Sequence, residues 1–451
     1  MKVDPSIFKG YDIRGIYPDT LNEEIAYKIG FAYASVYKPK KEVLIGHDVR
    51  KYSQKLKGEI IRGLNDAGAD VVDVGSMSTD MLYFGVGNYK TDGGIVVTAS
   101  HNPPEWHGAK MVRKGVVPMN LESGIGDIRD FVINNNITPN KNKGSVRKYD
   151  RILDDYSNYI ISWINPKNVK PLKVVINPNF GYGGLIFKKI VEVGKLPLEI
   201  VELNCKPNGN FPKGKPDPFI PENRVEFSEL VKSSKADLGI AWDGDSDRVF
   251  FCADGGLFVV PYYLNTLLIE HILEKQKGEK IIYDVRYIWG LIDTIKENGG
   301  VPIVSRVGHS YIKENMRKEN AIFAAESSGH TYYRDYWFSD CGMIPPVQIL
   351  EYLSKSKKNL SELIKPVMKK YFISEEYNSE VEDKEGKMNK ISEVYKDGKQ
   401  SRLDGIIIEY DDWRFVVRPS NTEPLLRLTL EAKSKELIEQ KRDEVLDLIR
   451  S

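Results

Sequence analysis

Short apolar runs alternate along most of the chain with longer segments in which apolar residues recur at helical spacing. In three stretches a helical pattern leads through a short turn containing Gly or Asp into an apolar strand, and these strands lie at residues 71–74, 238–242 and 301–304. Apolar strands that alternate with amphipathic helices are typical of α/β units. We therefore expect three related α/β domains.

The last part of the chain follows a different pattern. Residues 405–410, 413–417 and 425–430 are strand-like with short turns between them, and a charged helix is expected over residues 434–449. This pattern predicts a small α+β domain with antiparallel strands. The predicted fold class is thus α/β, with three related mixed α/β domains followed by a C-terminal α+β domain.

The length of the chain and its polar stretches indicate where the domains meet. At 451 residues the chain exceeds what one hydrophobic core usually supports. Residues 134–148, rich in Asn and Lys, are predicted to be a linker, and residues 355–370 to join the third and fourth domains. The predicted domains are residues 1–148, 149–252, 253–366 and 367–451.

The composition argues against several classes of protein. A net charge of +1 disfavours a nucleic-acid binder that works by bulk electrostatics. No apolar run approaches the roughly 20 residues that span a bilayer, and the N-terminus lacks the apolar segment of a signal peptide. Cys205, Cys252 and Cys341 form no CxxC pair, so neither a disulfide framework nor a zinc site is indicated. We expect a cytoplasmic enzyme without nucleic-acid or membrane partners.

The strongest local signal is the acidic loop Asp243-Gly244-Asp245-Ser246-Asp247-Arg248, which directly follows the strand at 238–242. Three carboxylates at alternate positions can converge on one hard cation, and oxygen ligands favour Mg²⁺, Mn²⁺ or Ca²⁺ over zinc. An EF-hand fits less well, because Arg248 occupies the place of its glycine and a strand precedes the loop. An acidic solvated turn is the alternative, but carboxylates this close repel one another unless a cation neutralises them.

A second polar loop, residues 98–104, follows the strand at 94–97 and contains Ser100. Two prolines end regular structure there, which predicts that Ser100 is exposed on a stiff loop. Ser100 beside His101 is also compatible with a hydrolase nucleophile, but no G-x-S-x-G elbow is present and adjacent residues rarely form a working dyad. Taken alone, the loop is equally compatible with an ordinary turn.

Two further loops carry groups that suit a phosphosugar. Residues 418–424 offer one guanidinium, two hydroxyls, an amide and backbone N–H groups, a good set for phosphate. A turn joining a hairpin is the alternative. Residues 325–330 place a carboxylate beside two serine hydroxyls, which suits vicinal sugar hydroxyls, although a helix-capping turn has the same composition.

Together, and in this order, the four loops resemble those of the α-D-phosphohexomutase superfamily. Within it the chain is most similar to the bispecific phosphomannomutase/phosphoglucomutase group. The opening Ile7-Phe8-Lys9-Gly10-Tyr11-Asp12-Ile13-Arg14-Gly15 resembles the N-terminal signature of that group, and residues 209–212 and 216–218 resemble another of its segments. The resemblance covers nearly the whole chain, from Phe8 to the loop at 418–424.

The resemblance implies four domains around a deep central cleft, with one loop from each domain. Ser100 would carry the phosphoryl group as a phosphoserine. Mg²⁺ would be held by Asp243, Asp245 and Asp247, with a phosphoserine oxygen of Ser100 completing the site. Among the catalytic residues, Arg14 would stabilise the transferring phosphoryl group, and Lys110 or His330 would serve as general base and acid. The residues implied in substrate binding are Tyr11, Arg248, His309, Glu326, Ser328, Arg418, Ser420, Asn421, Thr422 and Arg427.

The implied reaction moves a phosphoryl group between the 1- and 6-hydroxyls of mannose or glucose phosphate. It passes through a hexose 1,6-bisphosphate, which is also an activator, and the enzyme would be a monomer or homodimer. The sequence departs from the common pattern at Ser327, usually Met or, in glucosamine-phosphate mutases, Gln, and at Ser246 and Ala109, where Gly and Phe are frequent. A phosphoglucosamine mutase, a sugar-bisphosphate phosphatase and a non-catalytic sugar-phosphate sensor are the alternatives. A sensor needs no nucleophile at Ser100.

Overall fold

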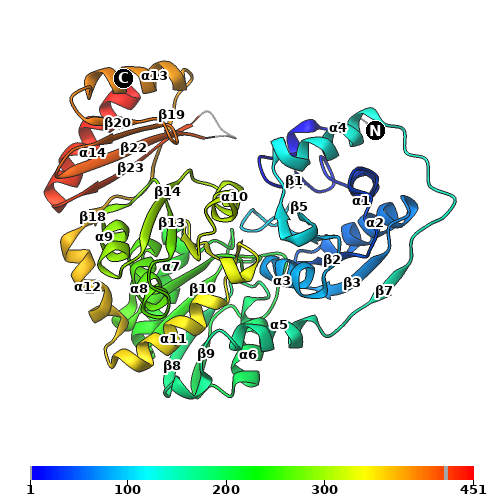
Figure 1. The fold of residues 1–451 in the computed structure, drawn as a ribbon, viewed down its shortest axis with the longest axis horizontal. Coiled ribbons are helices and arrows are strands. Elements are labelled where there is room, and N and C mark those ends of the chain that lie inside the picture. The colour runs from blue at the N-terminus through cyan, green and yellow to red at the C-terminus, as the bar shows by residue number, and fades with distance from the viewer. Residues whose placement is uncertain (1–2, 421–424) are drawn as a thin grey trace. The chain divides into compact units, whose positions relative to one another are not determined.

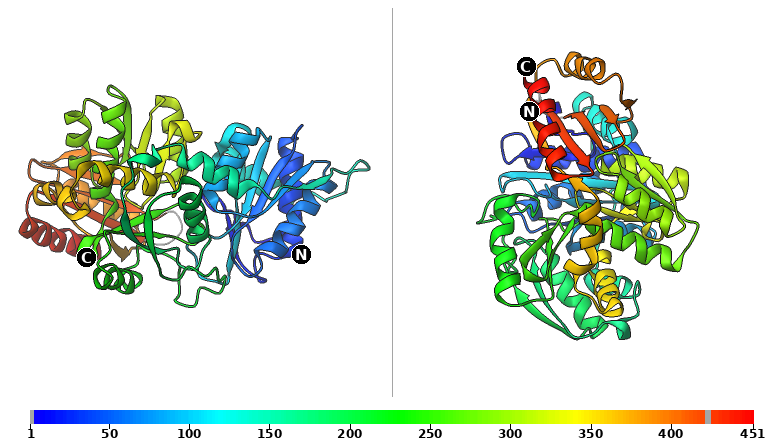
Figure 2. Two further views of the ribbon diagram at one scale, coloured as in Figure 1. Left: turned by 90° about the horizontal axis from the view of Figure 1, so that it is seen from below. Right: turned by 90° about the vertical axis from the view of Figure 1, so that its left-hand side faces the viewer.

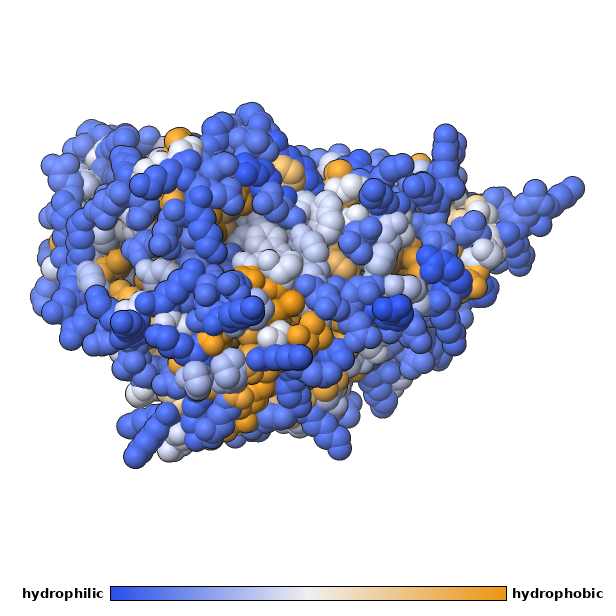
Figure 3. All heavy atoms as spheres, turned by 60° about the horizontal axis from the view of Figure 1, so that its bottom comes forward, coloured by the Kyte–Doolittle hydropathy of each residue, from blue (hydrophilic) through white to orange (hydrophobic). Residues whose placement is uncertain are grey.

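A computed structural model describes residues 3–420 and 425–451 of the chain. The chain divides into two compact units: the first comprises the residues up to Val259 together with Ser328–Leu360, and the second Val260–Ser327 with Ser361–Ser451. Hydrophilic residues cover most of the face seen in Figure 3. Among the residues described, none of the helices combines the length and the apolar character needed to cross a membrane.

The first unit opens with a mixed sheet whose strands lie in the order β1-β5-β4-β2-β3-β7, with β6 paired to β5 (Figure 1). Strands β2, β3, β4 and β7 are parallel, whereas β5 runs antiparallel to both β1 and β4. The strands are β1 (Ile13–Ile16), β2 (Val43–His47), β3 (Val71–Ser76), β4 (Gly93–Val97), β5 (Trp106–Arg113), β6 (Val117–Pro118) and β7 (Val146–Lys148). The helices are α1 (Glu23–Tyr37), α2 (Ser53–Asp66), α3 (Thr79–Tyr89) and α4 (Gly126–Asn134).

Part of the stretch predicted as a linker is a strand. Helix α4 ends at Asn134, but β7 pairs in parallel with β3, so that Val146 lies opposite Val71. All three residues of β7 are exposed. An exposed edge strand has no alternation of apolar and polar residues, which is why the sequence pattern did not reveal it.

A second mixed sheet of the same unit has the order β12-β11-β10-β8-β9. Strands β8, β9 and β10 are parallel and β11 runs antiparallel to β10, so the acidic loop at 243–248 is the turn between β10 and β11. The strands are β8 (Leu172–Asn177), β9 (Leu198–Glu202), β10 (Leu238–Trp242), β11 (Val249–Ala253) and β12 (Leu257–Val259). The helices are α5 (Ile152–Ile161), α6 (Gly183–Gly194) and α7 (Pro221–Ser233). The unit also contains β16 (Thr331–Tyr333), β17 (Ser339–Asp340) and α11 (Ile344–Ser356).

The second unit contains one parallel and one antiparallel group of strands (Figure 2). In the parallel group, β13 (Lys280–Asp284) lies between β14 (Val301–Ser305) and β15 (Phe323–Ala325). The antiparallel sheet consists of β18 (Phe372–Ile373), β19 (Tyr377–Glu380), β20 (Lys399–Ser401), β21 (Ile406–Glu409), β22 (Trp413–Pro419) and β23 (Leu425–Ala432). The helices are α8 (Pro261–Lys275), α9 (Trp289–Glu297), α10 (His309–Glu319), α12 (Leu360–Lys370), α13 (Lys384–Val394) and α14 (Lys435–Arg450).

The predicted fold class is confirmed, with mixed α/β sheets followed by an antiparallel α+β region. The strands predicted at 238–242 and 301–304 are β10 and β14, and the C-terminal helix is α14. Most of the predicted 355–370 connection is helix α12. One prediction needs correction, because Arg418 lies in β22 rather than in the following turn. Strand β22 extends that far because Arg418 pairs with Arg427 across the hairpin.

A buried carboxylate joins three segments of the first unit. Asp80, near the start of α3, is buried and accepts hydrogen bonds from Ser78 Oγ and from Tyr156 Oη, the latter at 2.5 Å. Cys341 Sγ lies 3.6 Å from the same carboxylate, and Tyr336 Oη donates to the Asp80 carbonyl at 2.6 Å. Loss of hydration on burial raises the pKa of Asp80 to about 7, although Ser78 and Tyr156 oppose the shift.

The raised pKa predicts a pH-dependent cost at Asp80. Between the ordinary pKa of 3.8 and about 7 the folded chain holds a proton that the unfolded chain releases, so this group lowers the free energy of unfolding as pH rises. We expect the stability of Asp80→Asn relative to the parent chain to rise with pH from 3.8 to about 7 and to level off above that, measured by urea unfolding. The exposed Asp19→Asn is the control. An unchanged pH dependence in Asp80→Asn would contradict the assignment.

Candidate active site

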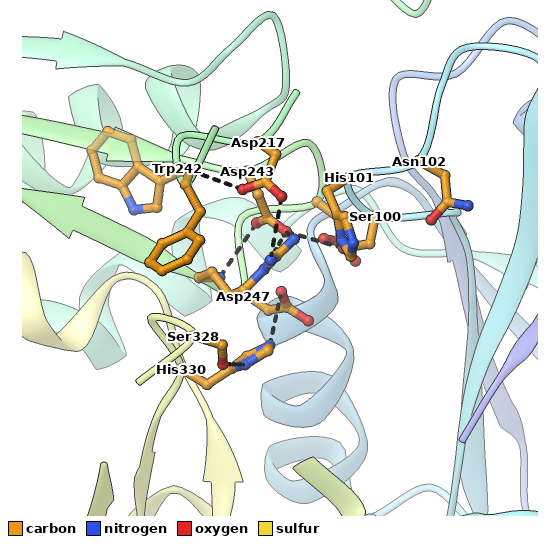
Figure 4. Close-up of polar contacts among 12 residues, drawn as sticks. Ser100, His101, Asn102, Asp217, Trp242, Asp243, Asp247, Ser328 and His330 are labelled. Carbon is orange, nitrogen blue, oxygen red and sulfur yellow. Dashed lines mark hydrogen bonds and ion pairs between the residues drawn. The ribbon is translucent and has the colours of Figure 1, made fainter. Parts of the chain in front are cut away.

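The loop between β4 and β5 holds Ser100 in an uncommon backbone conformation. Its φ is 50°, in the left-handed region that side chains other than glycine seldom adopt and that costs about 1 kcal/mol. The Ser100 N–H donates to Thr98 Oγ1 at 2.9 Å. Ser100 Oγ donates to Asp243 Oδ2 at 3.0 Å and lies 3.1 Å from His101 Nδ1 (Figure 4). Strained residues of this kind concentrate at functional sites.

Ser100 is buried, with 2% of its surface exposed, so the prediction of an exposed serine was wrong. The cause is the acidic turn between β10 and β11, which packs directly on the serine loop. A Cβ atom at Gly244 would lie 2.6 Å from the Ser100 carbonyl oxygen and 2.8 Å from Pro216. Glycine is therefore required for the two loops to approach, and the serine loses its exposure by that approach.

The three aspartates of the acidic turn meet as the sequence predicted. One carboxylate oxygen from each of Asp243, Asp245 and Asp247 lies within 4.8 Å of the others, and all three side chains are buried. Among the described residues, Asp245 Oδ1 accepts no hydrogen bond, and Asp247 Oδ1 has only His330 Nε2 nearby, at 3.5 Å. Ser246 has φ 64°, which explains why glycine is frequent at this position. Buried carboxylate oxygens that lack donors are a suitable ligand set for a hard divalent cation.

Two protein cations already lie against this cluster. Lys110 Nζ pairs with Asp245 Oδ2 at 2.7 Å and also contacts Asp247 Oδ2, whereas Arg248 Nη2 contacts Asp243 Oδ2 at 2.6 Å. Burial, reinforced by the other two carboxylates, raises the pKa of Asp243 to about 7 despite Arg248. Burial acts to lower the pKa of Lys110, but Asp245 and Asp247 raise it well above its ordinary value. Lys110 is therefore an ammonium in this arrangement.

Of the other predicted residues of the first unit, His330 contacts the acidic turn and Arg14 contacts the serine loop. His330 Nε2 lies 3.5 Å from Asp247 Oδ1, and its Nδ1 lies 3.0 Å from Ser328 Oγ (Figure 4). Arg14, in β1, contacts Asn102 Oδ1 of the serine loop through Nη1 and pairs with Asp12 through Nε at 2.9 Å. Tyr11 is half-buried just before β1.

The second unit contains Glu326, predicted to bind the sugar, and the residues predicted to bind the distal phosphate. Glu376 accepts from Arg418 Nη2 at 3.0 Å and from Arg427 Nη1 at 3.3 Å, so one carboxylate holds both guanidiniums. Glu326, after β15, is buried and lies 3.5 Å from Arg286 Nη2. Of the remaining predicted residues, Ser420 is buried and His309 begins α10, whereas Asn421 and Thr422 lie outside the described residues.

Several residues of these clusters were not among the predicted site residues, although Asp217 lies in the segment 216–218 noted in the sequence. Thr79 Oγ1 donates to Asp245 Oδ2 at 2.6 Å, and Asp217 lies 3.9 Å from Arg248. Arg50 contacts the serine loop, and Glu376 joins the two arginines of the second unit. Each lies outside the four loops, and only the tertiary fold brings it to them. The position of Arg50 shortly after the buried strand β2 was a weak hint, because polar residues at strand ends gather at one sheet edge.

Comparison with known proteins matches this arrangement to one family along nearly the whole chain. The profiles of phosphoglucomutase/phosphomannomutase alpha/beta/alpha domains I, II and III match residues 5–131, 154–256 and 261–371, and that of the C-terminal domain matches residues 376–448. The chain belongs to this family. It is accordingly an enzyme of the mutase type, an isomerase, which confirms the resemblance seen in the sequence.

Individual members of the phosphoglucomutase/phosphomannomutase family cover the chain almost end to end. A phosphomannomutase of Vibrio cholerae serotype O1 is 41% identical over 98% of each chain, and one of Escherichia coli K12 is 40% identical over 94% of each. A crystal structure of a phosphoglucomutase/phosphomannomutase family protein from Burkholderia thailandensis has a TM-score of 0.90 and 31% identity, covering 99% of this chain and 97% of that one.

The aspartate cluster predicts that magnesium stabilises the folded chain. A cation that binds only the native state raises its stability, by about 2.7 kcal/mol at a hundredfold excess over Kd. We expect Mg²⁺ to raise the Tm of the parent chain but not of Asp247→Asn. Asp237→Asn is the matched control, because Asp237 is exposed at the opposite end of β10. A response of Asp247→Asn equal to that of the parent chain would contradict the site.

Proposed function

We propose that this mutase interconverts hexose 1-phosphate and hexose 6-phosphate through a phosphoserine at Ser100 and a hexose 1,6-bisphosphate. The observation that carries the proposal is the position of Ser100 Oγ, 3.0 Å from Asp243 Oδ2 at the edge of the three-aspartate cluster. A hydroxyl beside a site for a divalent cation suits a phosphoryl carrier. A sugar-phosphate sensor has no need of that hydroxyl, so the arrangement favours the enzyme.

Each half of the proposed reaction exchanges one phosphorus–oxygen bond for another. In the first, a sugar hydroxyl attacks the phosphorus of phosphoserine. The bond between phosphorus and Ser100 Oγ breaks, and the hydroxyl proton passes to a base. In the second, Ser100 Oγ attacks the other phosphate of the reoriented bisphosphate, and the freed sugar oxygen takes the proton back. Mg²⁺ bound at the cluster would neutralise charge on the phosphoryl and serine oxygens.

The residues of the first unit suit these proton and charge movements. We assign proton transfer to Lys110 or His330, because both lie against Asp247, within the cluster that faces Ser100. As an ammonium, Lys110 can donate a proton at once but must lose one before it can accept one. Arg14, in contact with Asn102 of the serine loop, would stabilise the transferring phosphoryl group. Arg248 keeps the buried Asp243 paired while the hydroxyl of Ser100 changes its charge. Catalysis of this kind is mainly positioning and electrostatics.

We assign binding of the distal phosphate to Arg418, Arg427 and Ser420 of the second unit. The paired arginines offer a fork of N–H donors that matches phosphate. Sugar hydroxyls would be held by Glu326 and Ser328, with Tyr11 and His309 as further substrate contacts. Relatives named phosphomannomutase make mannose phosphate the first substrate to test, with glucose phosphate second and glucosamine phosphate third.

The mutase assignment predicts turnover that depends on one hydroxyl. With Mg²⁺ and a trace of hexose 1,6-bisphosphate, we expect phosphorus NMR to show 1-phosphates of mannose, glucose or glucosamine converting to 6-phosphates. Ser100→Ala should show no conversion, whereas Ser145→Ala, at an exposed serine, should match the parent chain. Relative rates identify the preferred sugar. Net release of inorganic phosphate would favour a phosphatase, and no turnover with any sugar would contradict the proposal.

The position of Lys110 predicts a separable effect on catalysis and on metal binding. General acid–base residues contribute about a hundredfold or more, so Lys110→Ala should lower kcat by at least about tenfold. The same change removes a cation from Asp245 and Asp247, so Mg²⁺ should bind at least as tightly as in the parent chain. Steady-state kinetics and a magnesium titration test the two effects. A loss of kcat below tenfold would count against Lys110 as the proton-transfer residue.

A further inference from the structure

We infer that Arg50 is the positioning residue that holds the Ser100 loop in its reactive conformation, an inference that rests on the proposed function of Ser100. Arg50 follows β2 and is buried, with none of its side-chain surface exposed. Its Nη2 donates to the carbonyls of Ser100 at 2.6 Å and of Asn102 at 2.7 Å. Its Nη1 donates to the carbonyls of Pro103 at 2.7 Å and of Trp106 at 3.0 Å.

One planar group thus fixes carbonyls on the serine loop from Ser100 itself to the start of β5. A guanidinium has four terminal N–H groups in a fixed plane, and all of them are used here. Arg50 holds the Ser100 carbonyl and Thr98 Oγ1 accepts from the Ser100 N–H, so the peptide planes on both sides of Ser100 are restrained, and with them its left-handed backbone at φ 50°. A lysine ammonium radiates its donors from one atom and cannot span carbonyls spread over seven residues.

Arg50 is itself held from two sides. Asp48 Oδ2 lies 3.3 Å from Arg50 Nε, and Asp48 Oδ1 accepts from the Arg50 backbone N–H at 3.0 Å. The ring of Phe211 lies 4.8 Å from the guanidinium carbon. A Cβ atom at Gly209 would lie 2.7 Å from Arg50 Cα, so residues 209–211 pack closely on Arg50. The segment at 209–212 was noted in the sequence but belongs to none of the four loops. Its role here is to hold Arg50 in place.

A positioning role predicts a specific kinetic signature. Displacement of a reacting group by about 1 Å costs about a hundredfold, so Arg50→Ala should lower kcat by about that factor while KM changes little. Transfer of radiolabelled phosphate from hexose 1,6-bisphosphate to Ser100 should slow in the same proportion. Guanidinium added below denaturing concentrations should restore at least about tenfold of the lost activity. The free ion can bind where the Arg50 side chain was and donate to the same loop carbonyls. It should restore none in Ser100→Ala.

The controls separate this inference from the proposed function. Arg62→Ala removes an arginine of α2 whose side chain is 57% exposed, and it should keep the parent kcat with no response to guanidinium. If the parent chain neither turns over hexose phosphate nor labels Ser100, the proposed function fails. If the parent chain does both and Arg50→Ala keeps its kcat, the inference about Arg50 is overturned.

Folding provides the last test. A fall in kcat that follows the loss of folded protein, with no response to guanidinium, would also overturn the inference. If Arg50→Ala does not fold, Arg50→Lys keeps the positive charge and the apolar stem. We expect it to fold with a kcat at least about tenfold below the parent value and near-normal KM, because the loop is no longer spanned. If Arg50→Lys kept the activity of the parent chain, the planar guanidinium of Arg50 would not be required.

Discussion

Burial of three carboxylates in one turn is the constraint on which the first unit depends. Charges removed from water are costly unless they are paired and hydrogen-bonded. Here the compensation comes from separate parts of the chain: Lys110 from β5, Thr79 from α3 and His330 from the segment before β16. The acidic turn therefore determines which elements must meet. Packing of these elements around the acidic turn also brings Ser100 to the cluster. The contacts that offset the cost of burying the three carboxylates are therefore also the contacts that assemble the site.

Features contained within a short stretch of the chain could be predicted from the sequence. The four loops were predictable because each follows an apolar strand and concentrates one kind of chemistry, and the aspartate cluster was confirmed with all three members together. Contacts across the fold were not predictable. The position of Arg50 after a buried strand was only a weak hint, and nothing near Thr79 distinguishes it from an ordinary polar residue until α3 is placed in space. Burial of Ser100 was missed for the same reason, since it depends on the close approach of Gly244.

The second unit shows the complementary arrangement, in which an anion gathers cations. Two guanidiniums placed side by side repel each other, yet Arg418 and Arg427 both contact Glu376. The pKa of this carboxyl is lowered: burial opposes the shift, and Arg286, Arg418 and Arg427 together overcome it. Glu376 is therefore charged and preorganises donors for an incoming phosphate. Glu376 lies just before β19, outside the predicted phosphate loop at 418–424, so the sequence pattern did not indicate this role.

The left-handed backbone at Ser100 limits which amino acids can replace it during evolution. Threonine carries the same hydroxyl, but its second branch at Cβ makes a positive φ a true outlier. Asparagine and aspartate accept that backbone more readily but lack the hydroxyl. Glycine accepts it without strain and offers no oxygen at all. Serine is the smallest side chain that satisfies both requirements, so backbone geometry, as well as reactivity, restricts the codons that natural selection can retain at this position.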